Sequence, residues 1–132
     1  MIPAMVLAAG IGSRLRPLTD RRAKSMVPVG DRPALAHLID RLHFAQVSTI
    51  VVNAHHRAED LRAFAPGHGI ILSEEEEILG TAGGVARASA LLGQSDALVW
   101  NADIVAEIDV RALTVAHART APHATLVVQP RR

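Results

Sequence analysis

The stretch VLAAGIGSRLRPLTDRRAKSMVPVG, from Val6 to Gly30, decides the fold class because it leads from an apolar run through two glycines into a group of cations. Five of the 14 lysines and arginines of the chain lie between Arg14 and Lys24. Backbone N–H groups of a glycine turn can bind phosphate oxygens, and nearby cations strengthen such binding. The stretch therefore predicts a phosphate site after a buried strand, where separate cations hold different phosphates of one triphosphate.

Two common phosphate-binding motifs do not fit this stretch. In the dinucleotide-binding pattern G-x-G-x-x-G, Leu15 stands where the third glycine belongs. The P-loop pattern places a lysine directly after its second glycine, whereas Gly12 is followed by Ser13 and Arg14. Lys24 is the only lysine among the 14 cations, which indicates that a compact ammonium is needed there. A solvated basic loop is the alternative that these residues leave open.

Apolar and β-branched runs alternate with segments of helical spacing along the whole chain. We predict strands at 4–8, 49–53, 69–73, 97–100 and 124–128, and helices at 33–45, 58–64, 80–92 and 110–119. Residues 10–31 are predicted to form a long loop with one helical turn near Arg14. The alternation predicts an α/β fold with three α/β/α layers, Rossmann-like, around a mostly parallel sheet. The length fits one domain, residues 1–132.

Ligands of such sheets bind at the carboxyl ends of the strands. Three stretches fall there: the loop at Gly10, residues 53–56 and residues 101–103. His55 and His56 are neighbours, so on an extended segment they point to opposite faces and chelate one metal ion poorly. We predict ordinary loop histidines. The glutamates at 74–77 are predicted to form a solvated acidic loop and no cation site.

Composition excludes several classes of protein. The chain has no cysteine, which excludes disulfides and thiolate metal sites. Its formal net charge of +1 gives no general polyanion surface, so no nucleic-acid partner is expected. No apolar run approaches the ~18 residues of a membrane span. Because residues 1–3 lack the basic start of a signal peptide, we expect a cytoplasmic protein with no membrane partner.

Several stretches, in the same order, resemble the signature of the sugar-1-phosphate nucleotidylyltransferases. They are LAAGIGSRLRPLT at 7–19, KSMVPV at 24–29, GDRPAL at 30–35, LGTAGG at 79–84 and VWNAD at 99–103. The resemblance implies the nucleotide-diphospho-sugar transferase type of the α/β fold. It covers only the nucleotide-binding half of the usual domain, so we expect a truncated form in which the sugar-phosphate portion is largely absent.

The resemblance also implies catalytic roles. Arg14 would hold the departing pyrophosphate, and Lys24 would neutralise phosphate charge during transfer. Asp103 would bind Mg²⁺, the expected cofactor, between the α-phosphate and the attacking sugar phosphate. No protein nucleophile is needed, because the sugar phosphate attacks directly.

The same resemblance implies a set of nucleotide-binding residues. In the family, the glycine loop wraps the triphosphate, the residues before it flank the nucleoside through their backbone, and a later glycine-rich stretch lines the base and ribose. The corresponding residues here are Gly10 and Gly12, then Leu7, Ala8 and Ala9, and finally Gly80, Thr81 and Gly83.

Three positions depart from the family pattern. Ala23 and Ser25 stand where prolines often flank the lysine, which we expect to make the loop more mobile. Ala102 replaces the glycine before the aspartate, and its Cβ is expected to crowd the nucleotide if the backbone there needs a positive φ.

The expected activity is transfer of a nucleoside monophosphate from an NTP to a sugar 1-phosphate, giving an NDP-sugar and pyrophosphate. GTP or UTP is the favoured donor, and mannose 1-phosphate or N-acetylmuramic acid 1-phosphate the favoured acceptor. One alternative is a truncated, non-catalytic nucleotide-binding module of the same fold. Another is a cytidylyltransferase acting on a different phosphate acceptor. A homo-oligomer is an alternative to a monomer.

Overall fold

The computed structural model describes residues 1–93 and 96–130, and it contains a four-stranded parallel sheet. The strands are β1 (Ala4–Leu7), β4 (Ile50–Ala54), β5 (Ile71–Glu74) and β6 (Leu98–Asn101), in the order β5-β4-β1-β6. In the register, Val6 lies opposite Val52 on one side and Trp100 on the other. The parallel α/β prediction is confirmed.

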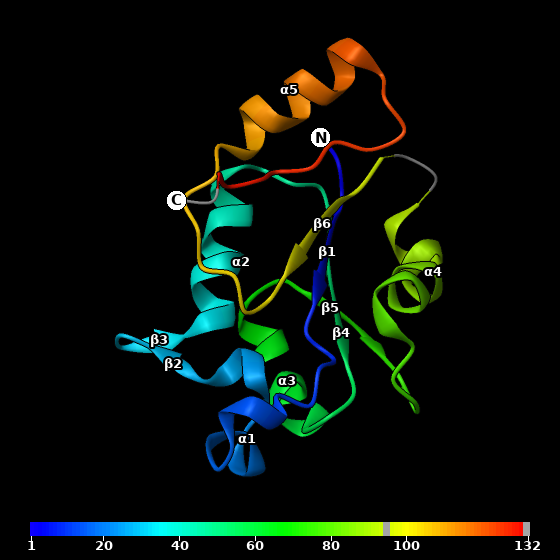
Figure 1. The fold of residues 1–132 in the computed structure, drawn as a ribbon. Coiled ribbons are helices and arrows are strands. Elements are labelled where there is room, and N and C mark those ends of the chain that lie inside the picture. The colour runs from blue at the N-terminus through cyan, green and yellow to red at the C-terminus, as the bar shows by residue number, and fades with distance from the viewer. Residues whose placement is uncertain (94–95, 131–132) are drawn as a thin grey trace.

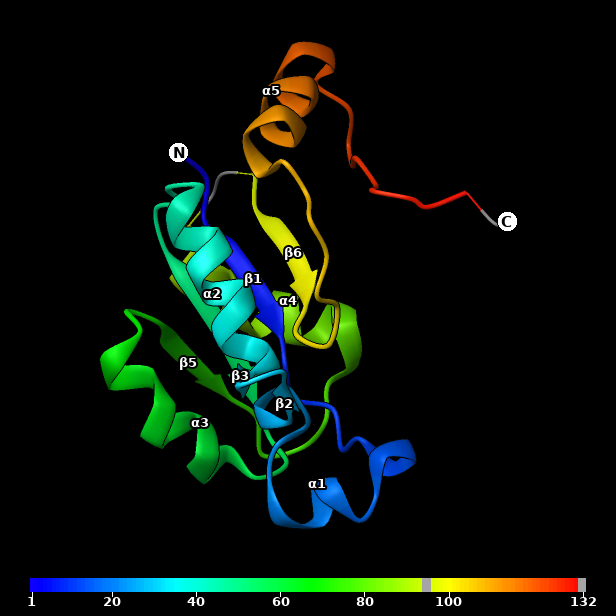
Figure 2. The same cartoon turned by 90° about the vertical axis from the view of Figure 1, so that its left-hand side faces the viewer.

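Helices cover both faces of this sheet, which gives the predicted three layers (Figures 1 and 2). Helices α2 (Ala34–Phe44) and α3 (Ala58–Phe64) pack on one face, and α4 (Gly80–Leu92) packs on the other. Helix α5 (Val110–Thr120) lies near the amino ends of the strands, and the side chain of Asp109 caps it by accepting a hydrogen bond from the Ala112 amide. No helix among the described residues is long and apolar enough to cross a membrane.

The core follows from the alternation of side chains along buried strands. On β1, Ala4 and Val6 belong to the cluster under α2 and α3, while Met5 between them belongs to the cluster under α4. All three are fully buried, because β1 is a central strand with helices on both sides.

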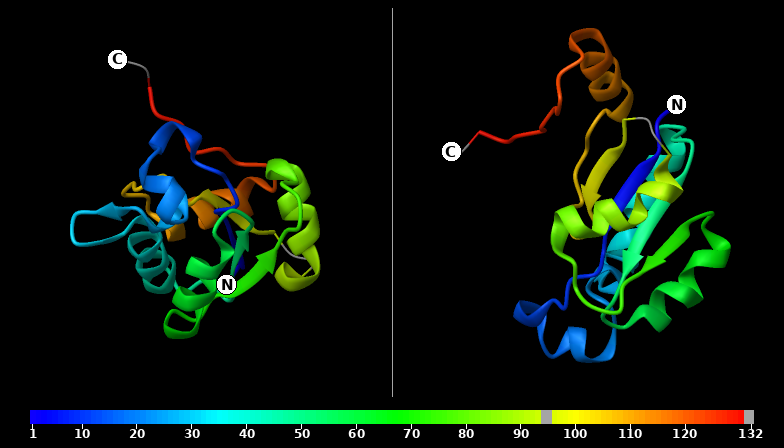
Figure 3. Two further views of the ribbon diagram at one scale, coloured as in Figure 1. Left: turned by 90° about the horizontal axis from the view of Figure 1, so that it is seen from below. Right: turned by 90° about the vertical axis from the view of Figure 1, so that its right-hand side faces the viewer.

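The stretch from Gly10 to Asp31 is more ordered than the predicted loop. It contains η1 (Ser13–Leu15), α1 (Leu18–Arg21), η2 (Lys24–Met26) and β2 (Pro28–Val29), which forms a short antiparallel ribbon with β3 (Arg32–Pro33). The helical turn predicted near Arg14 is present as η1. This stretch lies at the end of the sheet where the strands finish, opposite α5 (Figures 1 and 3).

The strand predicted at 124–128 is wrong, because these residues form no strand. Leu126 and Val128 are 81% and 80% exposed, and Thr125 is tied to α5 by a hydrogen bond of 2.8 Å between its hydroxyl and His117 Nδ1. A run of β-branched residues indicates only that its side chains suit a pleated, half-buried surface. It becomes a strand when its backbone meets a sheet edge, and here the described sheet ends at β6.

Candidate functional site

The glycine loop and the turn after β6 meet at the carboxyl end of the sheet. Lys24 Nζ lies 2.6 Å from Asp103 Oδ2, although the two residues are 79 positions apart in sequence. The reason is topological: β1 and β6 are hydrogen-bonded neighbours, so the segments that follow them emerge side by side. Beside this ion pair is a pocket of about 290 Å³, lined by Leu7, Ala8, Gly10, Lys24, Ser25, Asn101, Ala102 and Asp103.

The backbone conformation of the glycine turn requires glycine at one of its two glycine positions, Gly12. Gly12 has a φ of 69°, in the left-handed region, and a Cβ there would lie 2.8 Å from Thr19 Cγ2 and 3.1 Å from Lys24 Cβ. The hydroxyl of Thr19, which is buried, donates a hydrogen bond of 2.8 Å to the Gly12 carbonyl. Gly10 differs, since a Cβ there would meet nothing within 4 Å. Open space at Gly10 leaves the backbone accessible from the pocket.

Two residues that follow β4 along the chain hold the segment that carries Lys24. Asp60 Oδ2, on α3, accepts a hydrogen bond of 2.7 Å from the Ala23 amide. His56 Nε2 lies 2.8 Å from the Thr19 carbonyl and must carry the hydrogen, because a carbonyl oxygen can only accept. These contacts hold the segment at Thr19, within α1, and at Ala23, just before η2. Sequence reasoning missed this role for Asp60 and His56, which no local pattern reveals.

The residues predicted to line the base and ribose lie at the start of α4, which covers the face of the sheet opposite α2 and α3. Gly80, Thr81 and Gly83 form the first turn of α4, and none of them lines the pocket beside Lys24. Gly80 has a φ of 71°, and a Cβ on Gly83 would lie 2.7 Å from Leu79 Cβ. The chain therefore needs glycine at both positions to start α4 in this direction.

The acidic run 74–77 is not uniformly solvated, so the prediction is wrong for one of its members. Glu74 is exposed and accepts hydrogen bonds of 2.7 and 2.8 Å from Arg62, which lower the pKa of its carboxyl. Glu75 is only 6% exposed and accepts a hydrogen bond of 2.8 Å from Asn53 Nδ2. The alternation of β5 gave a signal that could have found a buried polar residue here, since neighbouring side chains of a strand face different surroundings.

Other predicted residues lie as follows. Arg14 is exposed on η1 and does not line the pocket, so its role stays a prediction. Ala102 is not among the described non-glycine residues with positive φ, and it packs in the core cluster that contains Trp100. The backbone there does not need a glycine. The buried Ser25 hydroxyl has no hydrogen-bond partner among the described residues.

Metal ligands are sparse at this site. Residues 1–93 and 96–130 contain no group of three or more His, Asp or Glu side chains arranged to hold an ion. Asp103 offers one carboxylate, already paired with Lys24. Mg²⁺ commonly binds through one or two carboxylates together with phosphate oxygens and waters. Asp103 therefore fits a Mg²⁺ ion that arrives with a phosphate-bearing ligand, and does not form a complete site by itself.

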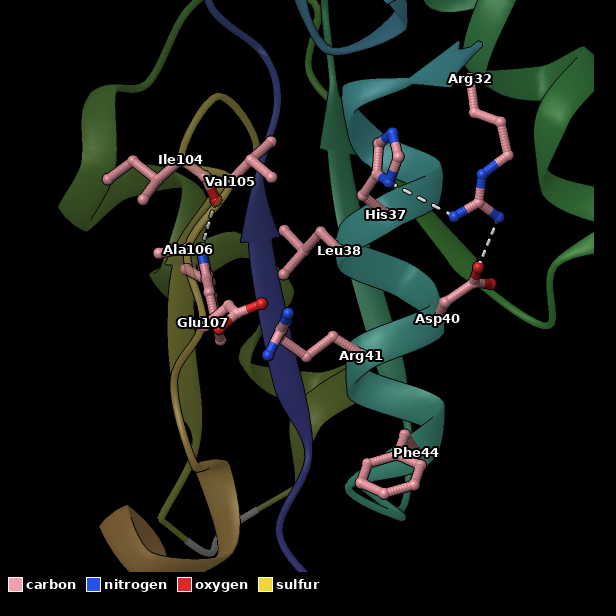
Figure 4. A pocket seen from close by; sticks show the side chains of 11 residues that line it. Arg32, His37, Leu38, Asp40, Arg41, Phe44, Ile104, Val105, Ala106 and Glu107 are labelled. Carbon is pink, nitrogen blue, oxygen red and sulfur yellow. Dashed lines mark hydrogen bonds and ion pairs between the residues drawn. The ribbon is translucent and has the colours of Figure 1, made fainter. Parts of the chain in front are cut away.

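A second, larger hollow of about 630 Å³ lies between α2 and the segment 104–107 (Figure 4). Its charged groups include Arg32, which is 2.6 Å from Asp40 and 3.3 Å from His37 Nδ1. Trp100 lines it and donates a hydrogen bond of 3.0 Å to the Ile104 carbonyl. None of the predicted site residues lies in this hollow.

Comparison with known proteins gives a consistent assignment. The family model for nucleotidyl transferases matches residues 3–132. The chain is 42% identical over 112 residues to N-acetylmuramate alpha-1-phosphate uridylyltransferase of Caulobacter vibrioides, covering 77% of this chain and 46% of that protein. It is 33% identical over 133 residues to mannose-1-phosphate guanyltransferase of Aspergillus fumigatus, covering 95% of this chain and 36% of that protein. The chain thus spans about half, or less, of these relatives.

The fold is similar to that of solved structures. The crystal structure of HddC from Yersinia pseudotuberculosis complexed with GMP-PN superposes with a TM-score of 0.78 at 24% identity, covering 89% of this chain and 54% of that one. At this level of identity the likeness concerns the fold.

Proposed function

The chain belongs to the nucleotidyl transferase family, and we propose from this premise that it provides the nucleotide-binding part of a sugar-1-phosphate nucleotidyltransferase. The reaction would convert an NTP and a sugar 1-phosphate into an NDP-sugar and pyrophosphate. The observation that carries the proposal is the 2.6 Å contact between Lys24 and Asp103 in one pocket with the backbone of Gly10. A cation, a carboxylate and an open glycine turn are the groups that a metal-bound triphosphate requires.

The chemistry needs no covalent intermediate. A phosphate oxygen of the sugar phosphate forms a bond to the α-phosphorus, and the bond from that phosphorus to the bridging oxygen breaks to release pyrophosphate. The protein contributes positioning and charge neutralisation. The Lys24 side chain is 27% exposed, so its ammonium can exchange Asp103 for a phosphate oxygen at small cost. Arg14 on η1 is proposed to receive the pyrophosphate.

Mg²⁺ is the proposed cofactor, held by Asp103 together with the phosphates. Its chemistry when bound is neutralisation of phosphate charge. In this chain Asp103 would hold that ion, and Lys24 would supply a second positive charge to the phosphates.

The relatives guide the choice of substrates. The 42% identical relative is a uridylyltransferase for N-acetylmuramate 1-phosphate, and several relatives at 32–34% identity are guanyltransferases for mannose 1-phosphate. We therefore propose UTP or GTP as donor, and one of these two sugar phosphates as acceptor.

A thermal-shift titration with ATP, CTP, GTP, UTP and dTTP, each with and without Mg²⁺, tests the proposal. A ligand at about 100 times its Kd stabilises a protein by about 2.7 kcal/mol, which shifts the melting temperature of a domain this size by several degrees. We expect a Mg²⁺-dependent shift with UTP or GTP. Pyrophosphate release on addition of the matching sugar 1-phosphate would show that this chain also carries out the transfer. Binding without release would favour a non-catalytic module, and no shift with any nucleotide would contradict the proposal.

A further inference from the structure

A buried polar pair lies behind the pocket, on the side of the sheet that α4 covers. Asn53, in β4, is 3% exposed, and Glu75, directly after β5, is 6% exposed. Asn53 Nδ2 donates a hydrogen bond of 2.8 Å to Glu75 Oε1. Burying a carboxylate costs free energy unless hydrogen-bond donors contact its oxygens. The hydrogen-bond partners of this pair therefore explain how the fold accommodates it.

The outer partners of the pair are two backbone amides. Asn53 Oδ1 accepts a hydrogen bond of 2.6 Å from the Ala8 amide, just after β1. Glu75 Oε2 accepts one of 3.2 Å from the Leu79 amide, just before α4. The result is one continuous series of hydrogen bonds, from Ala8 through Asn53 and Glu75 to Leu79. It joins the segment that leads into the glycine turn to the segment that starts α4.

Helix α4 leaves room for the pair at one position. A Cβ on Gly84 would lie 2.8 Å from Asn53 Nδ2 and 2.9 Å from Glu75 Oε1. Both atoms belong to the hydrogen bond between Asn53 and Glu75, so a side chain at residue 84 would press directly on it. The backbone of α4 therefore reaches the pair only because residue 84 is glycine.

We propose that Asn53 and Glu75 are positioning residues that set the spacing between the phosphate-binding and nucleoside-binding parts of the nucleotide site. This inference rests on the proposed function together with the roles that the family resemblance implies: the glycine turn that follows Ala8 would hold the triphosphate, and Gly80, which follows Leu79, would line the base and ribose. A purely apolar pair of similar volume would fill the same space, yet it would leave the Ala8 and Leu79 amides without acceptors. The pair thus acts through the backbone and touches no reacting atom.

Exchanging the two side-chain chemistries provides the test. In Asn53→Asp, two carboxylates face each other and the donor between them is lost. In Glu75→Gln, a single amide oxygen replaces the two carboxylate oxygens that accepted from Asn53 Nδ2 and from the Leu79 amide, so one of these donors faces the new NH₂ group. In the double variant, one oxygen of the new carboxylate at position 53 accepts from Ala8, and the other accepts from the new amide at position 75. The oxygen of that amide accepts from Leu79. Asn53→Asp combined with Glu75→Gln therefore restores every hydrogen bond and keeps the net charge.

The measurement is the affinity of wild type and variants for the NTP that binds best and for inorganic tripolyphosphate, below the lowest melting temperature of the set. Tripolyphosphate needs only the phosphate-binding part. We expect each single variant to weaken NTP binding about tenfold and tripolyphosphate binding less than about twofold. The double variant should return to within about twofold of wild type for both ligands. Hydrogen exchange of the Leu79 amide, faster in Glu75→Gln and slow again in the double variant, checks the link without any ligand.

Distinct outcomes separate the inference from the proposed function. Equal NTP affinity in wild type and single variants overturns the inference while the proposed function stands. Equal weakening of both ligands, or no recovery in the double variant, also overturns it, because the pair would then serve stability alone. A wild type that binds neither ligand contradicts the proposed function, and the positioning role falls with it.

Discussion

Two polar pairs of nearly the same length lie at the carboxyl end of the sheet, in opposite environments. Lys24 and Asp103 are 2.6 Å apart, with side chains 27% and 45% exposed. Asn53 and Glu75 are 2.8 Å apart and nearly excluded from solvent. An exposed ion pair contributes only about 0–1 kcal/mol to stability, whereas a buried carboxylate must keep its partners. The exposed pair is therefore free to exchange partners, and the buried pair is fixed.

The difference in exposure implies different roles for the two pairs. The exposed pair should matter for ligand binding and turnover, with little effect on the folded state. The buried pair and its surroundings should matter for the folded state and for the spacing of the loops. Substitutions in each pair, or beside it, can separate these effects.

The largest expected effect is that of Lys24→Ala on turnover, measured in the complete enzyme whose nucleotide-binding part this chain is proposed to provide. Removing one group that stabilises developing charge typically costs about a hundredfold or more in rate. The melting temperature should change little, because the ion pair is exposed. Pyrophosphate release and thermal unfolding measure the two effects, with Arg119→Ala on α5 as a control that removes an exposed cation far from the pocket. Turnover equal to wild type would remove Lys24 from the mechanism.

The next largest expected effect is that of Gly84→Ala, beside the buried pair, on the free energy of unfolding. The new Cβ would lie within 3 Å of the Asn53 and Glu75 side chains, and overpacking of this kind costs about 1–3 kcal/mol. Alanine favours a helix over glycine by about 1 kcal/mol, so stabilisation is the opposite outcome. Urea unfolding decides between them. Ser89→Ala, at an exposed position of the same helix, is the control and should be nearly neutral.

Asp103→Asn sharpens the exposed side of the comparison by changing the metal dependence. We expect the gain in nucleotide affinity on adding Mg²⁺ to shrink by about tenfold, because Asp103 is the one carboxylate among the described residues that line the pocket. Affinity without Mg²⁺ should stay the same or rise, since Lys24 no longer has an anionic partner. Calorimetric titration with and without Mg²⁺ measures both. Asp20→Asn, which removes the exposed carboxylate paired with Arg16, should change neither.

The smallest expected effect is that of Arg62→Met on the pKa of Glu74, the neighbour of the buried Glu75. The hydrogen bond from Arg62 lowers the pKa of Glu74 below its ordinary value of 4.5, so Arg62→Met should let that pKa rise toward the ordinary value. Because the pKa is lowered in the folded state, the contribution of the pair to stability is present above the ordinary pKa and is lost as the pH falls through the lowered one. An NMR titration of the Glu74 carboxyl measures the change, and an unaltered pKa in the variant would show that Arg62 is not its cause.

Local pattern predicted most of the fold. The helices at 58–64 and 80–92 have the predicted bounds, and β1, β4, β5 and β6 lie within a residue or two of the predicted strands. The run at 124–128 shows the limit of this reasoning, because β-branched residues signal a strand only where a sheet edge receives them. The two adjacent glutamates show it again, since composition treated Glu74 and Glu75 alike while the end of β5 turns them to different surroundings.

The sequence by itself determined the alternation of strands and helices, the turn at Gly12 and the family, because these depend on residue types at short spacings. The tertiary structure alone decided which distant groups meet. Lys24 reaches Asp103 because β6 is the neighbour of β1, and Asn53 reaches Glu75 because β5 is the neighbour of β4. Strand order is set by how the whole chain packs, so no local spacing encodes it.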